Sequence, residues 1–420
     1  MNNKFKFKIN IFGLGYVGLT LAAKLLEKGF LVNGFEISDK ILDHLLIKKK
    51  AHFIEPGINK IIRKAILKKK FIIKKKLENK INERTINVIT IGTPIINEKI
   101  YLGSIYNVCK EINSNLQNEK SIIILRSTVK VGTTRKLKKK FKKKIYFSFC
   151  PERTIEGAAI KELSVNPQII ASEDNYTKKN VKKFFNLFNK NIIEVNKFEK
   201  SELLKLFDNT YRDINFSIGN EFGRISNKLG LSGEEIIKLC NKNYSRTNIP
   251  LPGLVGGPCL EKDPYILLES TNLKKDNIIY ASRKLNENMM KNGLYEICKL
   301  IDIKKITKIC IVGLAFKGKP KTNDLRGSLA IPMIKNLYKK NRKLKIYGLD
   351  INVNNQDIKN LGINIFDKKI KYDLFIIQNN AIFIKKIGFS NFIKKLNKKG
   401  LLYDYWNHFK NNHKNYINYA

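Results

Sequence analysis

The chain has 420 residues, of which 43% are hydrophobic, and its formal net charge is +45. It is too long for a single hydrophobic core, so we expect two or three domains. No apolar run approaches the roughly 20 residues that span a bilayer, and the first residues show no signal-peptide pattern. These features argue against membrane insertion and predict a cytoplasmic protein.

The cysteines and histidines argue against a metal site. Six cysteines lie far apart without a C-x-x-C pair, and none of the four histidines stands at metal-ligand spacing with a cysteine. We therefore expect no metal, no disulfide framework and reduced thiols.

The positive charge comes from lysines that are spread along the whole chain. Runs of three lysines occur at 48–50, 68–70, 74–76 and 142–144. No basic segment is interleaved with stacking aromatic residues, as it would be in an RNA-binding module. Solvated lysine surfaces are favoured over a specific nucleic-acid partner, which stays open as the alternative.

A dinucleotide-binding pattern opens the chain. A strand-like segment at 5–12 leads into the glycine motif GLGYVG at 13–18, a helical segment, a second strand at 31–35 and an acidic residue. The glycines allow a tight turn and close approach of a pyrophosphate, and the acid accepts hydrogen bonds from a ribose while repelling a 2′-phosphate. We expect NAD binding by Gly13, Gly15, Tyr16, Val17, Gly18 and Glu36.

The α/β pattern continues with buried strands at 86–91, 122–125 and 145–149. Thr93, Thr128 and Glu152 each follow the end of one of these strands. Ligands of open α/β sheets bind at the carboxyl ends of strands, so these three residues predict a site. Taken singly, each is more often a helix cap or a turn residue.

The periodicity then changes to that of a long amphipathic helix from Ser201 to Leu229. Its apolar residues recur every three or four positions, at Leu204, Phe207, Tyr211, Ile214, Ile218, Phe222, Ile225 and Leu229. Ser201 would cap its start and Gly230 its end, and Ser232-x-x-Glu235 predicts the start of a further helix. Lys205, Asn209 and Arg212 share one face of the long helix. This polar face is either part of a functional site or simply exposed to solvent.

The stretch LPGLVGGPCLEKDPY at 251–265 presents Cys259 on a turn rich in glycine and proline. Lys262 and Asp263 follow within four residues. A thiol in such a setting suits a nucleophile. A buried structural cysteine near a turn is the alternative.

A second α/β segment follows, with strands at 308–312, 345–349, 373–377 and 401–403 and a short polar tail. Its GLAFKG at 313–318 and Asp350 repeat weakly the first glycine motif and its acid. We therefore predict an α/β fold with two Rossmann-like nucleotide-binding domains joined by a helical region. The predicted boundaries are 1–198, 199–304 and 305–420.

Together these motifs resemble the UDP-glucose/GDP-mannose dehydrogenase family over nearly the whole chain. The matching segments are GLGYVGL at 13–19, EPG at 55–57, GTP at 92–94, STVKVGTT at 127–134, CPERTIEG at 150–157, ELLKLFDNTYRD at 202–213, GLVGGPCLEKDP at 253–264 and GLAFKGKPKTNDLRGS at 313–328. The form of CPERTIEG and of the last segment looks most like the branch that acts on UDP-N-acetylhexosamines.

The resemblance implies NAD-dependent, four-electron oxidation of the sugar C6 alcohol to a carboxylate, for surface polysaccharide synthesis. UDP-N-acetyl-D-mannosamine is the first choice of substrate and UDP-N-acetyl-D-glucosamine the second. It also implies a homodimer formed through the central helices, and a C-terminal domain that binds the UDP-sugar.

The resemblance further implies roles for individual residues. Cys259 would form a thiohemiacetal and then a thioester. Lys205 would stabilise the oxyanion, and Asn209 would hydrogen-bond the same oxygen or an ordered water. Asp263 would orient Lys205 and a water, Glu152 would be the general base, and Thr128 would place the water. Substrate contacts would come from Glu152, Arg153, Lys205, Asn209, Arg212, Arg246 (from a partner subunit), Gly256 and Lys317, and cofactor contacts also from Thr93, Thr128 and Arg326.

Three other functions remain open at this point. UDP-glucose could be the substrate instead, or the chain could be a two-domain dehydrogenase of the hydroxyacid or 6-phosphogluconate type. The latter would leave Cys259 and the second nucleotide-binding fold unexplained. A non-catalytic binder of nucleotide sugars or nucleic acid is the alternative from another class.

Overall fold

The computed structural model describes residues 5–77, 83–96, 99–117, 120–141, 145–271, 273, 276–409 and 413–419. The chain forms two compact units, the first made of 1–208 and 265–272 and the second of 209–264 and 273–420. Helices α8 (Phe198–Lys228) and α10 (Asp263–Thr271) each contribute to both units. Because the helical region is divided in this way, the three-domain boundaries at 198 and 304 stay a prediction.

Unit 1 contains an eight-stranded sheet in the order β10-β9-β8-β7-β4-β1-β2-β3. All neighbouring pairs are parallel except β8 with β9. The strands are β1 (Lys8–Phe12), β2 (Val32–Phe35), β3 (Phe71–Lys74), β4 (Thr85–Ile89), β7 (Ile122–Leu125), β8 (Tyr146–Phe149), β9 (Gln168–Ser172) and β10 (Ile192–Val195), with a separate hairpin of β5 (Ile95–Ile96) and β6 (Lys99–Ile100). The strands expected at 5–12, 31–35, 86–91, 122–125 and 145–149 are all present.

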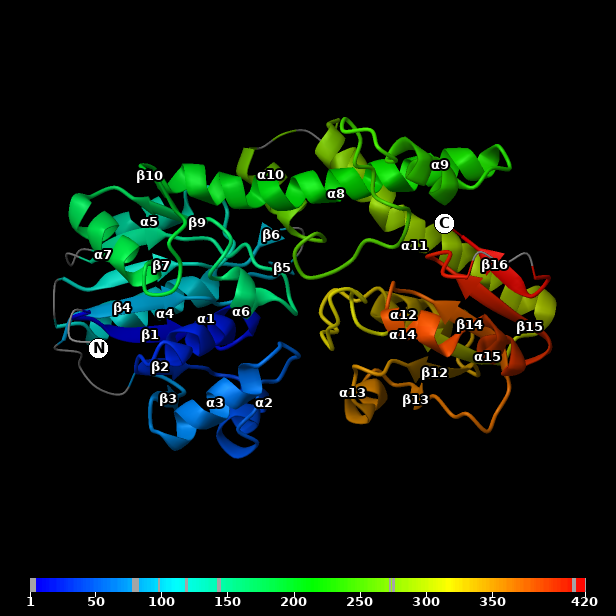
Figure 1. Cartoon of the computed structure of the whole chain (residues 1–420), viewed down its shortest axis with the longest axis horizontal. Coiled ribbons are helices and arrows are strands. Elements are labelled where there is room, and N and C mark those ends of the chain that lie inside the picture. Colours follow the sequence, from blue (N-terminus) through cyan, green and yellow to red (C-terminus); the bar gives the residue numbers. More distant parts are fainter. Residues whose placement is uncertain are drawn as a thin grey trace. The chain divides into compact units, whose positions relative to one another are not determined.

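Helices cover both faces of this sheet because successive strand residues point to opposite sides. Ile122 and Ile124 of β7 belong to one core, whereas Ile123 and Leu125 belong to the other. The helices of this unit, coloured blue to green in Figure 1, are α1 (Tyr16–Glu27), α2 (Asp39–Leu42) continuing into a π-helical turn (Asp43–Ile47), α3 (Ile58–Leu67), α4 (Gly103–Asn115), α5 (Thr133–Lys140), α6 (Ala159–Glu162) and α7 (Asn175–Phe185).

The direction of winding reverses between β1 and β4, which lie side by side in the sheet. Chain from β1 leads outward to β2 and β3, and chain from β4 leads the other way to β7 and β8. A crevice forms at such a switch point in doubly wound sheets, and ligands bind there. The glycine motif follows β1 and Thr93 follows β4, so the fold places both at this point.

Unit 2 contains an all-parallel six-stranded sheet in the order β13-β12-β11-β14-β15-β16. Its strands are β11 (Lys308–Val312), β12 (Lys345–Leu349), β13 (Asn364–Ile365), β14 (Tyr372–Ile377), β15 (Leu396–Asp404) and β16 (Tyr416–Asn418). The expected polar tail thus contains a strand, because Tyr416 and Ile417 pair with Leu402 and Tyr403 of the sheet edge.

The helices of unit 2 cover this second sheet and form the region that leads to it. They are α9 (Gly233–Cys240), α11 (Ile278–Lys304), α12 (Ala330–Lys340), α13 (Asn355–Asn360), α14 (Ile382–Ile387) and α15 (Phe389–Lys394). Ile309 and Ile311 of β11 belong to one core, and Cys310 and Val312 to the other. No helix within the described ranges is long and apolar enough to cross a membrane.

The long helix α8 begins earlier than its sequence signals predict. It starts at Phe198, so Ser201 lies inside the helix rather than at its cap, with a buried hydroxyl that lacks a hydrogen-bond partner. Gly230 follows its end with a φ of +72°, as expected for a C-terminal glycine. Ser232 does cap α9, since its hydroxyl accepts a hydrogen bond from the Glu235 amide at 3.3 Å.

Within unit 2, α8 buries its polar side and exposes its apolar one. The buried polar residues are Asn209, Thr210, Asp213, Ser217, Asn220 and Ser226. The exposed apolar residues include Tyr211, Ile218, Phe222 and Ile225, followed by Leu229 directly after the helix. A helix that packs on a single core normally buries its apolar side and exposes its polar one.

Candidate active site

The glycine motif of unit 1 forms a turn that only glycine accommodates at two of its positions. Gly13 has a φ of +89°, and its carbonyl accepts a hydrogen bond from the Thr90 hydroxyl at 2.7 Å. A Cβ on Gly18 would lie 1.9 Å from the Gly13 carbonyl oxygen, so this glycine lets α1 pack against the turn. A Cβ on Gly15 would meet no atom within 4 Å. The open space at Gly15 fits a ligand that approaches the backbone closely.

Glu36 lies at the end of β2, where the sequence places the ribose-binding acid. The residue is 8% exposed, and its carboxylate accepts hydrogen bonds from the Leu14 amide at 2.7 Å and the Ser38 amide at 2.9 Å. The acid is therefore fixed against the glycine turn. This arrangement, together with the space at Gly15 and the N-terminus of α1, fits NAD.

Tyr16 and Glu55 connect the start of α1 to the loop that follows Glu152. The Tyr16 hydroxyl donates a hydrogen bond to Glu55 and accepts one from the Gly157 amide at 2.8 Å. The Ile160 amide also donates to Glu55, at 3.0 Å. Burial raises the pKa of Tyr16 far above its usual range, so the hydroxyl stays protonated. Val17, which follows it, is half-buried.

Two of the residues expected at strand ends, Thr93 and Thr128, are joined by a hydrogen bond. The Thr93 hydroxyl donates a hydrogen bond to the Thr128 carbonyl at 2.7 Å, which joins the loops after β4 and β7. Thr93 is buried and Thr128 is half-buried.

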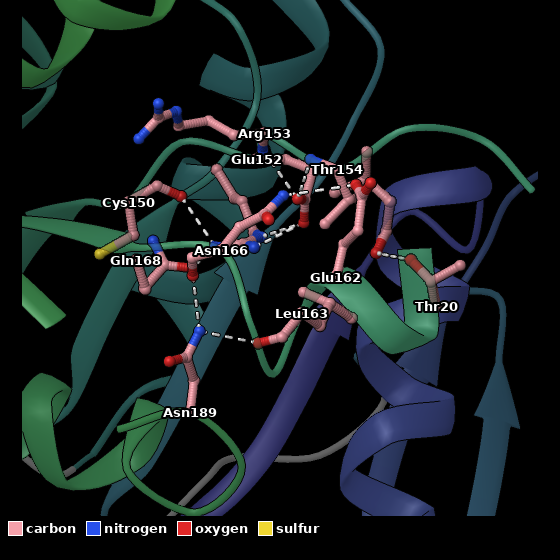
Figure 2. A network of polar contacts seen from close by, with 12 residues as sticks. Thr20, Cys150, Glu152, Arg153, Thr154, Glu162, Leu163, Asn166, Gln168 and Asn189 are labelled. Carbon is pink, nitrogen blue, oxygen red and sulfur yellow. Dashed lines mark hydrogen bonds and ion pairs between the residues drawn. The ribbon is translucent and has the colours of Figure 1, made fainter. Parts of the chain in front are cut away.

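Glu152 is held by a buried network that Figure 2 shows from close by. One of its oxygens accepts hydrogen bonds from Arg126, from Nη2 at 2.5 Å and from Nε at 3.1 Å. The other accepts from the backbone amides of Arg153 at 2.7 Å and Thr154 at 2.8 Å. Arg126 in turn donates to the Cys150 carbonyl and to Gln168. The carboxylate therefore carries four hydrogen bonds, its full capacity.

The surroundings of Glu152 have opposing effects on its ionisation. Burial would raise the pKa of Glu152, but the charge and hydrogen bonds of Arg126 and the bonds from Thr154 lower it below its ordinary value. Glu152 is thus a carboxylate in this structure. Acting as a base on water requires that it give up one of its four hydrogen bonds when substrate binds.

A small pocket adjoins this network. Besides Arg126 and Glu152, the pocket is lined by Pro151, Arg153, Thr154, Glu162, Leu163, Asn166, Pro167, Gln168 and Asn189. Arg153, an expected substrate contact, points its guanidinium to Asp208 of α8 and forms an ion pair at 2.8 Å between Nε and Oδ2.

In unit 2, a residue expected to act from the long helix is hydrogen-bonded to one expected to act from the cysteine turn. Asn209 of α8 donates a hydrogen bond from Nδ2 to Oδ2 of Asp263 at 2.6 Å, and Lys262 binds Oδ1 at 2.9 Å. Asp263 is fully buried. The amide of Asp263 also donates to the Cys259 carbonyl at 2.9 Å, whereas the Cys259 residue is exposed. A buried structural cysteine is therefore excluded.

The cysteine turn is fixed by its glycines and by one buried arginine. Gly257 has a φ of +107°, and its amide donates to the Gly327 carbonyl at 2.8 Å. Arg283 of α11 is 1% exposed and donates to the Leu260 carbonyl at 3.1 Å and the Val255 carbonyl at 3.4 Å. Nη1 of Arg283 forms an ion pair with Oδ1 of Asp213 of α8, at 2.6 Å. Arg283 thus binds the backbone on both sides of Cys259.

The remaining expected residues lie at or near the surface. Lys205 is half-buried and lies one turn before Asn209 on α8, whereas Arg212 and Arg246 are exposed. Lys317 lies over the Phe316 ring, 5.2 Å from its centroid. Arg326 pairs with Asp324 at 2.6 Å. Gly256 packs against the Gly327 loop, because a Cβ on it would lie 2.8 Å from the Gly327 carbonyl oxygen.

Sequence reasoning did not single out Arg126, Arg283 or Glu55 as part of these networks. Arg126 could have been noticed as a charged residue that follows the buried strand IIIL directly, and Arg283 as one on the same helical face as Asn286, Met289 and Met290. Among the described residues, no group of three or more His, Cys, Asp or Glu side chains could hold a metal ion.

Three domain models of one family match the chain in order. The NAD-binding domain of the UDP-glucose/GDP-mannose dehydrogenase family matches residues 7–189, its central domain residues 199–288 and its UDP-binding domain residues 310–411. The chain is thereby covered over most of its length.

Individual relatives agree with the family match. A UDP-N-acetyl-D-mannosamine dehydrogenase of Methanococcus maripaludis is 34% identical over 79% of this chain and 77% of its own length. One of Methanococcus vannielii is 30% identical over 93% of this chain and 91% of its own. The solved structure of a UDP-D-ManNAc dehydrogenase from Pyrococcus horikoshii superposes with a TM-score of 0.84 at 25% identity, over 98% of each chain.

Proposed function

Because the chain belongs to the UDP-glucose/GDP-mannose dehydrogenase family, we propose that it is an NAD-dependent UDP-N-acetyl-D-mannosamine 6-dehydrogenase. The observation that carries the proposal is the joined group of Asn209, Asp263 and the exposed Cys259 turn in unit 2. The named relatives favour the N-acetylmannosamine substrate over UDP-N-acetyl-D-glucosamine and UDP-glucose. We place the reaction in the cytoplasm, in keeping with six cysteines that form no disulfide.

We assign the covalent steps to Cys259. The C6 alcohol is first oxidised to the aldehyde. The thiolate then attacks the aldehyde carbon, a C–S bond forms, and the carbonyl oxygen takes up a proton to give a thiohemiacetal. Oxidation of this adduct gives a thioester, and attack by water breaks the C–S bond to release the carboxylate and the thiolate. NAD, when bound, supplies the electron acceptor for both oxidations.

The other proposed catalytic residues act on the C6 oxygen of the sugar and on the water that attacks the thioester. Lys205 and Asn209, one helical turn apart on α8, stabilise the negative charge that develops on the C6 oxygen. Asp263 fixes the Asn209 amide through the 2.6 Å hydrogen bond, so the direction of that donor is set before substrate binds. Thr128 places the water, and Glu152 accepts its proton after releasing one of its hydrogen bonds.

The UDP-sugar is assigned to the C-terminal sheet, whose Gly313 loop repeats the glycine turn of unit 1. The amides of Leu314 and Ala315 donate to Asp350 at 2.7 and 3.1 Å, as Leu14 does to Glu36. Contacts to the UDP-sugar are proposed for Lys317, Arg153, Arg212 and Gly256, and for Arg246 from a partner subunit. Arg326 is proposed as a cofactor contact.

The experiment that tests the function is to count NADH formed from a panel of UDP-N-acetyl-D-mannosamine, UDP-N-acetyl-D-glucosamine and UDP-glucose. Two NADH per molecule of UDP-N-acetyl-D-mannosamine, with this sugar preferred, is the expected result. One NADH per sugar would contradict the thioester route. Preference for another sugar would contradict the proposed substrate. No turnover with any of the three would favour a non-catalytic binding protein.

Two alanine variants separate the structural glycine from the one that faces the cofactor. Gly15→Ala is expected to leave the melting temperature unchanged but to weaken NAD binding at least about tenfold, because the methyl group fills the space where the pyrophosphate approaches. Gly18→Ala should lower the melting temperature as well, since its Cβ would lie 1.9 Å from the Gly13 oxygen. Equal NAD affinity of Gly15→Ala and the unaltered chain would contradict this assignment.

We also propose a homodimer that covers the exposed apolar side of α8. Tyr211, Ile218, Phe222 and Ile225 recur along one side of the helix, and Leu229 after its end and Leu239 of α9 are likewise exposed. An apolar row of this length on a helix whose opposite side is already buried suits a second copy of the same surface. A mass of 48.6 kDa in sedimentation experiments would contradict the dimer.

A further inference from the structure

Arg283 of α11 is the largest fully buried side chain among the described residues, and none of the steps above uses it. Its Nη1 donates to Oδ1 of Asp213 at 2.6 Å and to the Leu260 carbonyl at 3.1 Å, and its Nη2 donates to the Val255 carbonyl at 3.4 Å. Leu260 follows Cys259 directly in the chain. The guanidinium is therefore bonded to the backbone next to the proposed nucleophile.

Two asparagines extend this arrangement to the start of the same stretch. Oδ1 of Asn220, on α8, accepts a hydrogen bond from the Gly253 amide at 2.8 Å, and its Nδ2 donates to Oδ1 of Asn286 on α11 at 2.9 Å. Asn286 in turn donates to Oδ1 of Asp213 at 2.9 Å. One buried network thus joins α8, α11 and the stretch that carries the cysteine.

The contacts to the turn explain why a cation lies here. Burial of an arginine costs free energy unless its charge is paired and its donors are bonded, and an apolar side chain of similar size would fill the space at a lower cost. An apolar side chain would not bind the two carbonyls. Three of the nine residues from 251 to 259 are glycine, so this stretch has much conformational freedom to lose when it is held in one shape.

We propose that Arg283 is a positioning residue for Cys259: it holds the turn in the conformation from which the thiol reaches the aldehyde carbon. The inference rests on the proposed function for the role of Cys259. Attack on a carbonyl requires the reacting atoms to be about 3–3.5 Å apart and aligned, so a turn that samples several shapes attacks more slowly.

This role predicts that the two oxidations depend on Arg283 to different degrees. The first moves a hydride from C6 to NAD and forms no bond to the thiol. The second begins with the C–S bond. When the turn is loosened, the alcohol should still become the aldehyde, but aldehyde that Cys259 does not capture should leave as a product.

The test uses Arg283→Lys, which keeps a cation opposite Asp213 but lacks the planar fork that reaches both carbonyls. With UDP-N-acetyl-D-mannosamine, we expect carboxylate formation to fall at least about tenfold and consumption of the sugar to change by less than about threefold. NADH per sugar should then fall from two towards one, and mass spectrometry should find the aldehyde among the released sugars. The matched control is Arg224→Lys, because Arg224 forms an exposed ion pair with Glu221 on α8. It should still give two NADH.

Hydrogen exchange of the segment 253–263 tests the holding of the turn without substrate. In Arg283→Lys this segment should exchange at least about threefold faster, and in Arg224→Lys at the unaltered rate. Asn220→Ala removes the neutral bond to the Gly253 amide and should change exchange and NADH yield in the same direction. This second variant decides the question if Arg283→Lys does not fold.

Unaltered exchange of the segment in the folded variants would overturn the inference. Faster exchange with two NADH per sugar at the normal rate would overturn it as well, and so would an equal loss of sugar consumption and carboxylate formation, which indicates general damage. An unaltered chain that forms no NADH from any UDP-sugar would instead reject the proposed function. The exchange rates would then still show whether Arg283 holds the turn.

Discussion

Replacement of Cys259 by serine is expected to lower turnover of UDP-N-acetyl-D-mannosamine by at least about three orders of magnitude. A serine hydroxyl is ionised far less than a thiol at neutral pH, so it attacks the aldehyde much more slowly. An ester formed on serine is also a poorer acyl donor to water than a thioester. The measurement is the steady-state rate of carboxylate formation, with the binding of NAD determined in parallel.

The matched control is Cys240→Ser, because Cys240 is an exposed thiol in the same unit and is assigned no role. This variant should retain the unaltered rate. NAD should bind both variants equally, since neither Cys259 nor Cys240 is among the residues assigned to the cofactor. A Cys259→Ser protein that releases carboxylate at the normal rate would exclude the covalent route and leave a direct oxidation of the aldehyde hydrate.

Features that depend on neighbouring residues in the sequence were predicted well. The glycine turn, the strands around it and the acid at Glu36 follow from local pattern, and the structure adds the Leu14 amide as a partner of that acid. The pairing of Asn209 with Asp263 was not predicted, because the two residues are far apart in the chain. The resemblance implied that Asp263 orients Lys205 and a water, whereas the 2.6 Å hydrogen bond joins Asp263 to Asn209. Their catalytic roles, like that of Cys259, stay predictions.

Features that depend on tertiary packing were not predictable in this way. The apolar residues of α8 indicate an amphipathic helix, but the sequence does not tell which side meets the rest of its own chain. Here Asp213 and Asn220 are buried, because Arg283 and Asn286 donate to Oδ1 of Asp213 and the Gly253 amide donates to Oδ1 of Asn220. Arg126 and Arg283 were missed for the same reason. An arginine is usually exposed, and only its partners in space explain its burial.

Substitution of Arg126 by methionine is expected to destabilise unit 1 by roughly 3–5 kcal/mol at pH 7, because it leaves Glu152 as a buried charge without its cation. Glu152 would keep the amides of Arg153 and Thr154 but lose both hydrogen bonds from the guanidinium. The Cys150 carbonyl and Gln168 would lose a donor as well. The effect should appear in urea denaturation of the full chain, with hydrogen exchange of β7 and β8 assigning it to this unit.

The pH dependence of the stability lost in Arg126→Met identifies the cause of that loss. In the unaltered chain the pKa of Glu152 is lowered, so the pair stabilises the fold above the unfolded pKa, and this contribution is lost as pH falls through the folded value. In Arg126→Met, only the hydrogen bonds from the Arg153 and Thr154 amides still oppose burial, so the pKa of Glu152 should rise. Protonation then relieves the penalty, so the difference between the two proteins should shrink from pH 7 towards pH 4. Arg153→Met is the matched control: its ion pair with Asp208 is partly exposed, and it should cost less than about 1 kcal/mol at either pH. A loss in Arg126→Met that is constant with pH would mean that lost packing, rather than the unpaired carboxylate, destabilises the unit.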